Sequence, residues 1–200
     1  MTRRFTGGKL VVATHNPGKL DEIRNMLNDP AIALSSAADH GLDAPPETGT
    51  AFIENALLKA RFVAQKTGLP ALADDSGLCV EGLNDAPGVY SADWAETPKG
   101  RDFNAAMQRV LTGLEGNPNR CAKFVSVMAL AWPDGHAEVA EGVVEGIITH
   151  TMQGTGGHGY DPIFQPEGGV KTFAEMTLEE KNAISHRARA LNVMIKKCFR

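Results

Sequence analysis

Two adjacent carboxylates, those of Asp74 and Asp75, follow a short apolar run in the segment 73–77 (ADDSG). If the run is a strand, the two side chains point to opposite sides, so one can bind a metal while the other acts elsewhere. Carboxylates held close together repel each other unless a cation neutralises them. Glu47, in a proline-rich loop before a long helical segment, adds a third candidate carboxylate. Oxygen ligands in this number suit Mg²⁺, which shares a substrate phosphate; the alternative is an ordinary Asp-Asp-Ser-Gly turn.

A second group of residues, 14–19 (THNPGK), lies where an apolar strand gives way to a helix. Free backbone N–H groups at a helix start, together with the helix dipole, bind phosphate well. A lysine there is slightly unfavourable for folding, because the helix N-terminus already carries about half a positive charge. We therefore expect an anionic ligand, although an ordinary helix cap with a solvated lysine would have the same sequence. The residues are Thr14, His15, Asn16, Pro17, Gly18 and Lys19.

The segment 156–162 (GGHGYDP) combines glycines with two rings. Glycines let the backbone approach a flat ligand on which His158 or Tyr160 could stack, whereas the simpler interpretation is a glycine loop between strands. The overlapping run GTGGHG fits the dinucleotide-binding pattern G-x-G-x-x-G, but a Tyr-Asp-Pro sequence follows where a helix should begin, so that fold is not expected. A P-loop is excluded as well, because Ala13 and Leu20 stand where its pattern needs Gly and Ser or Thr.

A fourth group, 179–188 (EEKNAISHRA), places Lys181, His186 and Arg187 near two expected helix starts. These side chains could contact a ligand, although a solvated basic face is the usual fate of such charges. Each of the four groups has an ordinary explanation when it is taken alone. Together they are far more specific than any one of them.

Hydrophobic periodicity and turn residues predict one domain of α/β or mixed α+β class, with a mixed sheet and no evident domain boundary. The clearest helix is 51–67, in which six residues repeat every three or four positions: Ile53, Ala56, Leu57, Ala60, Val63 and Ala64. Further helices are expected at about 18–27 and 102–114, and after the caps Thr177 and Ser185. Strands are expected at 9–14, 31–34, 71–73, 78–80 and 163–164 and, as a long hairpin, at 121–132 and 136–149.

The composition argues against several classes of protein. With 200 residues, 42% of them hydrophobic, the chain can build one sizeable core, or one core with two lobes. A formal net charge of −4 argues against a protein that coats nucleic acid. No apolar run approaches the roughly 20 residues of a membrane span and no signal peptide is evident, so a membrane is not an expected partner either. Three cysteines without a CxxC pair argue against a disulfide framework, which makes a reducing cytoplasm the default location.

Six separated blocks of the sequence resemble the inosine triphosphate pyrophosphatase family in their order and approximate spacing. The blocks are ATHNPGKLDEI, ETGTAFIENALLKA, ALADDSGL, APGVYSA, GTGGHGYDPIF and KNAISHRARAL. The resemblance implies Mg²⁺-dependent hydrolysis of a non-standard purine nucleoside triphosphate (dITP, ITP, XTP or dXTP) to the monophosphate and pyrophosphate, which cleanses the nucleotide pool. It also implies a long central mixed sheet flanked by helices, within one two-lobed domain over residues 1–200 that has a cleft between its lobes. The family further suggests a homodimer with one or more Mg²⁺ per subunit.

The resemblance also suggests roles for the four groups. Residues 14–19 would hold the triphosphate, with their lysine taking part in catalysis. Asp75 would accept a proton from the attacking water and would bind the metal. The further metal ligands would be Glu47 and Asp74, and Ser76 would contact the substrate. The residues that would enclose the nucleotide, the last two by reading the base edge, are His158, Gly159, Tyr160, Asp161, Lys181, His186 and Arg187.

The chain departs from the family pattern at two places, and two other functions compete with the resemblance. Many relatives have Phe where this chain has His158, and a basic residue where it has Asp93 and Trp94. One alternative function is a Maf-like pyrophosphatase for other modified nucleotides, but the Ser- and Arg-rich opening motif of that group is missing. The other is a non-catalytic nucleotide sensor on the same fold, which should have lost Asp75 or the metal carboxylates, whereas all are present.

Overall fold

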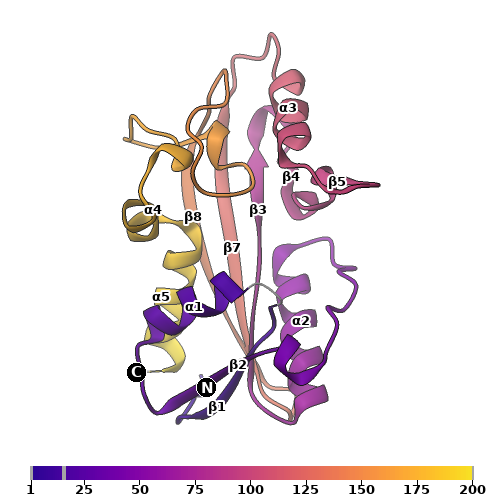
Figure 1. The fold of residues 1–200 in the computed structure, drawn as a ribbon, viewed down its shortest axis with the longest axis vertical. Helices are drawn as coiled ribbons and strands as arrows, with labels where there is room; N and C mark the ends of the chain where they lie inside the picture. Colours follow the sequence, from indigo (N-terminus) through magenta and orange to yellow (C-terminus); the bar gives the residue numbers. More distant parts are fainter. Residues whose placement is uncertain (1, 15–16, 200) are drawn as a thin grey trace. The chain divides into compact units, whose positions relative to one another are not determined.

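A computed structural model of the chain describes residues 2–14 and 17–199. These residues form a seven-stranded sheet flanked by helices, with strand order β2-β1-β3-β7-β8-β9 and with β4 paired to β3 (Figure 1). Its strands are β1 Gly8–Val12, β2 Ile32–Ser36, β3 Ala71–Val80, β4 Ala86–Pro87, β7 Cys121–Ala131, β8 Ala137–Ile148 and β9 Phe164–Pro166. A separate two-stranded sheet consists of β5 Glu96–Thr97 and β6 Gly100–Arg101. The α-helices are α1 Pro17–Leu27, α2 Phe52–Thr67, α3 Phe103–Gly113, α4 Leu178–Ile184 and α5 His186–Cys198.

The large sheet contains both parallel and antiparallel pairs, as the sequence predicts. Strand β1 runs parallel to β2 on one side and to β3 on the other. The short strand β4 is antiparallel to β3, and β9 is antiparallel to β8. Strands β7 and β8 form the expected hairpin, whose turn is closed by the N–H of Gly135 donating to the carbonyl of Trp132 at 3.0 Å. The mixed α/β class is therefore confirmed.

Contacts divide the chain into two compact units, each made of several segments. Unit 1 comprises Met1–Asp75, Ser126–Gly142 and Arg189–Arg200, and unit 2 comprises Ser76–Val125 and Val143–Ala188. Each unit has a hydrophobic cluster of its own. In unit 1, α1 and α5 pack on one cluster with β1 and β7, and Figure 1 shows α2 on the other side of these strands. In unit 2, one face of α3 packs with residues of β7, β8 and β9.

Helix α2 follows the predicted periodicity except at its first turn. Ala56 and Ala60 are fully buried, and Gly68 ends the helix in the left-handed conformation with φ of 69°. Ile53, which the pattern assigns to the core, is instead 44% exposed, whereas the polar Asn55 is only 2% exposed. Asn55 is buried because its amide makes hydrogen bonds to the N–H of Gly49 and to Asp75 on β3, which a hydrophobic side chain could not make.

The segment Asp-Asp-Ser-Gly does not form a turn, contrary to the interpretation of its sequence as a break between two short strands. Strand β3 runs without interruption through these residues. Pairing explains the difference, because β3 is hydrogen-bonded to β1 near Ala71 and to β4 near Cys79. Sheet partners at both ends outweigh the local turn preference of the four residues.

Helix caps agree with the sequence in the second half of the chain. The Asp102 carboxylate accepts a hydrogen bond from the N–H of Ala105 at the start of α3. Thr177 caps α4 in the same way, and the Ser185 hydroxyl accepts from the N–H of Ala188 in the first turn of α5. Both terminal helices therefore begin where the sequence predicts.

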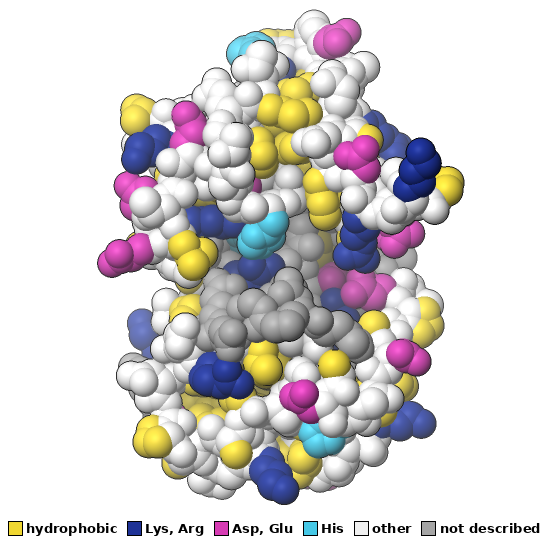
Figure 2. All heavy atoms as spheres, in the orientation of Figure 1, with side chains coloured by type: hydrophobic (Ala, Val, Ile, Leu, Met, Phe, Trp, Pro, Cys, Tyr) yellow, Lys and Arg dark blue, Asp and Glu magenta, His cyan; other side chains and the backbone are white. Residues whose placement is uncertain are grey.

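Charged side chains are dispersed over the face shown in Figure 2. On that face, Lys and Arg lie singly among acidic, hydrophobic and uncharged residues rather than in a continuous stripe. Within residues 2–14 and 17–199, none of the helices is both long enough and apolar enough to cross a bilayer.

A buried carboxylate on β8 gives unit 1 a testable sensitivity to acid. Burial would raise the pKa of Glu138, but hydrogen bonds from Lys197, the Arg3 N–H and His136 lower it from 4.5 to about 2. The stability that comes from ionised Glu138 is therefore present above pH 4.5 and is lost as the pH falls toward 2. At about 1.4 kcal/mol per pH unit, it amounts to at most about 3 kcal/mol.

We expect the Glu138→Gln variant to lose much of this dependence. Its free energy of unfolding, measured in urea at several pH values, should change less with pH between 4.5 and about 2 than that of the wild type. Equal slopes for the two proteins in that window would contradict the assignment.

Candidate functional site

Two carboxylates of unit 1 converge on one ammonium group. The Nζ atom of Lys59 lies 2.8 Å from Oε1 of Glu47 and 2.9 Å from Oδ1 of Asp75. The other carboxylate oxygen of Asp75 accepts a hydrogen bond from Nδ2 of Asn55 at 3.4 Å. Glu47, Asn55, Lys59 and Asp75 form what we call the acidic cluster.

Helix α2 and strand β3 position the acidic cluster. Asn55 and Lys59 are four residues apart on α2, so they lie on the same face of the helix. The Oδ1 atom of Asn55 accepts from the N–H of Gly49 at 2.7 Å, which fixes the loop that carries Glu47. A Cβ atom at Gly49 would lie 2.6 Å from this same Oδ1, so the close approach requires a glycine.

The protonation of the acidic cluster reflects burial and mutual charge. Burial raises the pKa of Asp75 above its usual value, and the positive charge of Lys59 offsets this only in part. Burial lowers the pKa of Lys59, but the charges of Asp75 and Asp74 outweigh it, so the pKa of this ammonium lies above its usual value. The ammonium group of Lys59 is thus kept protonated beside Asp75, a carboxylate whose basicity is increased. A basic carboxylate is suited to accept a proton.

The same carboxylates can be tested as ligands for Mg²⁺. Among the described residues, no three His, Cys, Asp or Glu side chains gather closely enough to hold a metal by themselves. The structure therefore brings Glu47 and Asp75 together, and the charge of Asp74 acts on Lys59 as well. Mg²⁺ is usually held by one or two carboxylates, with waters and substrate phosphates as the remaining ligands. The donor set of Glu47 and Asp75 fits that pattern.

Part of the predicted phosphate-binding segment lies outside the described residues. Thr14 follows the end of β1 and is buried, with 7% of its surface exposed. His15 and Asn16 are not among the described residues, and neither are the side chains of Pro17, Gly18 and Lys19. The helix itself begins at Pro17, within one residue of the expected start at about 18.

In unit 2, a buried ion pair organises the glycine loop, residues 154–160. The carboxylate of Asp161 accepts hydrogen bonds from Nζ of Lys181 and, at 2.8 Å, from the N–H of His158. The side chains of Asp161 and Lys181 are 3% and 8% exposed, so both charges are buried. A Cβ atom at Gly157, where φ is 68°, would lie 2.1 Å from Oδ2 of Asp161. The acidic side chain therefore points inward and holds the loop in place.

The two rings of the glycine loop have different surroundings. His158 is exposed, whereas Tyr160 is only 2% exposed. The hydroxyl of Tyr160 donates to the carbonyl of Ser91 at 2.8 Å, and its ring packs edge-on against Phe103 at 5.7 Å between centroids. Burial raises the pKa of Tyr160 well above its usual value. The Tyr160 ring cannot stack on a ligand in this arrangement, which leaves the exposed His158 as the predicted stacking residue.

Aromatic packing fixes His186 at the start of α5. Its ring is stacked on that of Phe124, with 4.7 Å between centroids and an interplanar angle of 9°. Phe124 in turn packs against Phe164 and Phe173 in the core of unit 2. With one ring face covered in this way, the edge of His186 remains suited to hydrogen bonding. Arg187 follows directly and is 9% exposed.

Comparison with known proteins concerns nearly the whole chain. A model of the Ham1 family matches residues 10–197. This chain belongs to the Ham1 family. The resemblance that the six sequence blocks indicate is thereby confirmed.

Individual relatives of this Ham1 chain align with all or nearly all of its length. A dITP/XTP pyrophosphatase of Ruegeria pomeroyi is 51% identical over 202 residues, which cover 100% of this chain and 99% of the relative. The solved HAM1 protein from Coxiella burnetii has a TM-score of 0.89 at 40% identity, over 94% of this chain and 96% of its own. A solved nucleoside-triphosphatase / dITP/XTP pyrophosphatase from Mycobacterium abscessus has a TM-score of 0.80 at 44% identity. The match covers 94% of this chain and 99% of that protein's chain. The mixed α/β fold is therefore shared with solved members of the family.

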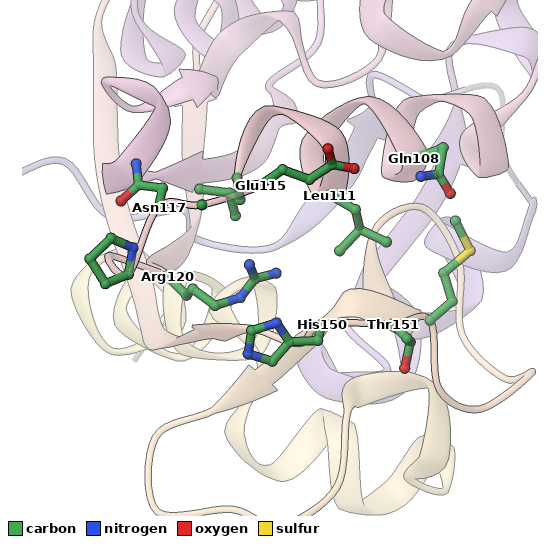
Figure 3. Close-up of a pocket in the computed structure, with 11 residues that line it drawn as sticks. Gln108, Leu111, Glu115, Asn117, Arg120, His150 and Thr151 are labelled. Atoms are coloured by element: carbon green, nitrogen blue, oxygen red, sulfur yellow. The ribbon is translucent and has the colours of Figure 1, made fainter.

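An open pocket of about 800 Å³ in unit 2 is lined by none of the predicted site residues. Figure 3 shows Arg120 and His150 on one side of this pocket and Leu111 of α3 on the other. The Arg120 guanidinium donates from Nε to the carbonyl of Ile148 and from Nη2 to that of Thr149, both at 2.6 Å. Because these hydrogen bonds hold the backbone at the end of β8, we assign a structural role to this arginine.

Sequence reasoning missed Asn55 and Lys59 in this Ham1 chain. Both belong to the block ETGTAFIENALLKA, which was used for the resemblance and for its apolar periodicity. A signal was available, because a polar Asn at a core-facing position with a Lys four residues later is unusual on a packed helix face. Such a pair indicates that the face meets buried charge, here that of Asp75.

Proposed function

We propose that this protein hydrolyses non-standard purine nucleoside triphosphates (dITP and ITP, XTP and dXTP) to the monophosphate and pyrophosphate. Two relatives that align over nearly all of the chain carry the name dITP/XTP pyrophosphatase. The observation that carries the proposal is the convergence of Glu47 and Asp75 on a single cation in a member of the Ham1 family. That arrangement suits the handling of a triphosphate with its divalent ion.

The acidic cluster is assigned to the phosphate chemistry. Asp75 accepts the proton of the attacking water, a role that its raised pKa favours. Glu47 and Asp75 would hold Mg²⁺, which when bound offsets phosphate charge and stabilises the leaving pyrophosphate. Asp74 supports the cluster electrostatically and Ser76 contacts substrate. The segment 14–19, including Lys19 as a catalytic cation, is assigned to the triphosphate.

The residues of unit 2 are assigned to the nucleoside. The glycine loop lets the backbone approach the ligand, and His158 is assigned to stacking on the base. His186 and Arg187 donate hydrogen bonds to the 6-keto oxygen of hypoxanthine or xanthine. The 6-amino group of adenine would set donor against donor, and leaving a buried donor unpaired costs about 1–3 kcal/mol.

This proposal predicts a strong preference between two substrates that differ at the 6-position. Purified protein with Mg²⁺ should release pyrophosphate from dITP much faster than from dATP, by a factor that repeated polar mismatches can raise to about 10⁴. The measurement is kcat/KM for each nucleotide, with pyrophosphate detected directly. Equal values for the two nucleotides would remove the assignment of His186 and Arg187 to the base.

Two further properties belong to the same proposal. A homodimer is expected from the family resemblance, and molar mass in solution measures it directly. A cytoplasmic location is supported by the free state of all three cysteines, Cys79, Cys121 and Cys198, since reducing compartments maintain free thiols.

A further inference from the structure

Lys59 occupies the position between two carboxylates that a metal would require. Its ammonium group is bonded to Oε1 of Glu47 and to Oδ1 of Asp75, the two acidic side chains that fit Mg²⁺. The side chains of Lys59 and Asp75 are only 13% and 9% exposed, whereas that of Glu47 is 43% exposed. The ion pair with Asp75 is therefore largely shielded from water, and it is much stronger than an exposed pair.

Each carboxylate oxygen of Asp75 already accepts one hydrogen bond. Oδ1 is bonded to Lys59, and Oδ2 accepts from Asn55. Mg²⁺ must approach carboxylate oxygens to about 2.0–2.1 Å, which an ammonium group bonded to the same oxygens prevents by both space and charge. A metal that lies between Glu47 and Oδ1 of Asp75 must therefore displace Lys59, whereas a metal at Oδ2 has to share that oxygen with Asn55 or displace its amide.

The two partners differ in their freedom to move. Asn55 is 2% exposed and is anchored by its other amide atom to the backbone of Gly49. Lys59 carries its charge on a flexible four-carbon stem, which can swing its ammonium group away while the helix stays in place. The lysine is the partner that can leave.

We propose that Lys59 is a built-in counter-ion, which holds Glu47 and Asp75 together in the metal-free protein and is displaced from them when Mg²⁺ binds. This inference rests on the proposed function, because it takes these two carboxylates as the metal ligands. It makes metal binding an exchange of one cation for another. Metal affinity is then lowered by the strength of the ion pairs that have to be broken.

The direct test is the affinity of the nucleotide-free full chain for Mn²⁺ and Mg²⁺, measured by titration calorimetry. The Lys59→Met variant should bind metal at least about tenfold more tightly than the wild type, because no ammonium group competes for the carboxylates. The matched control is Lys66→Met, since Lys66 lies on the same helix and contacts the ring of Phe62 at 5.9 Å. Its metal affinity should equal that of the wild type. Equal or weaker binding by Lys59→Met would overturn the proposal.

Thermal unfolding gives a second readout that needs no turnover. In Lys59→Met the two carboxylates repel each other without compensation, so saturating Mg²⁺ should raise Tm by more than it does in the wild type. Lys59→Gln, which keeps a hydrogen-bonding group of moderate length without charge, replaces the Met variant if that one does not fold. Equal increases of Tm in the wild type and the folded variant would count against the exchange.

Two further measurements separate this proposal from the proposed function. If Asp75→Asn leaves the metal affinity of the nucleotide-free protein unchanged, the metal does not bind this carboxylate and the exchange is refuted. If the wild type fails to hydrolyse dITP while Lys59→Met still binds metal more tightly, the proposed function falls and the exchange stands. If the wild type hydrolyses dITP but the wild type and Lys59→Met bind metal equally tightly, the proposed function stands and the exchange falls.

Discussion

The Asp75→Asn variant is expected to lose about 10²- to 10⁴-fold in kcat for dITP hydrolysis, the usual contribution of a positioned general base. Asparagine has nearly the same shape as aspartate, but its amide cannot accept a proton from water. In the native protein, burial raises the pKa of Asp75, so a base of increased strength is lost. Because Asp75 lies inside the continuous strand β3, the substitution should leave the fold intact.

The measurement is kcat and KM for pyrophosphate release, together with Tm and nucleotide binding for each variant. A suitable control is Asp43→Asn, because Asp43 lies exposed in the loop before α2. Full activity in Asp75→Asn would show that another group takes the proton. Loss of activity together with loss of folded structure would be uninformative about catalysis, so the circular dichroism spectrum of the variant is recorded before the assay.

Removing the carboxylate of Asp161 is expected to destabilise the protein by about 3–5 kcal/mol, the typical cost of leaving a buried charge without its partner. Both members of the ion pair are buried, and without Asp161 the charge of Lys181 would keep its contact with the ring of Phe173, 5.6 Å from the centroid. The N–H of His158 would lose its acceptor as well. We therefore expect Asp161→Ala to lower the free energy of unfolding and to loosen the glycine loop.

A double-mutant comparison distinguishes a structural ion pair from a substrate contact. The Asp161→Ala/Lys181→Met protein should regain much of the lost stability in urea unfolding, because no uncompensated charge remains. Lys171→Met is the exposed control, since the pair of Lys171 with Glu180 at 3.3 Å should contribute less than about 1 kcal/mol. A stable Asp161→Ala single variant that is impaired only in substrate KM would instead assign Asp161 to direct nucleotide binding.

Much of the fold could be predicted because periodicity and caps are local properties. The apolar face of α3 and the hairpin of β7 and β8 were identified in this way, since one packs a regular stripe and the other has a clear glycine turn. The segment Asp-Asp-Ser-Gly could not be placed correctly, because its strand conformation depends on partners distant in sequence. Local turn preference is informative only where no such partner exists.

Short motifs single out Asp75 and Lys181 as candidate site residues, and the structure shows both in buried ion pairs, whereas their roles stay predictions. Lys59 could not be assigned to the site from the sequence, because a lysine on a helix is usually solvated. The two carboxylates that contact it are evident only in the folded chain. Tyr160 shows the converse error. Its neighbours in sequence suggested an exposed stacking ring, whereas its hydroxyl bonds to Ser91, which is 69 residues away. A contact between residues so far apart in the chain cannot be inferred from the spacing of residues in a single sequence.

The order in which the segments of the two units follow one another affects synthesis on the ribosome. Every residue of unit 2 precedes Arg189, so unit 2 has been translated in full before the part of α5 that closes the unit 1 cluster. Until Leu191, Met194 and Ile195 emerge, the cluster that contains residues of β1 and α1 lacks these three members. A nascent chain stalled at this stage would display exposed hydrophobic surface to chaperones and proteases. The unit that contains the first residues of the chain is therefore the last to complete its hydrophobic cluster.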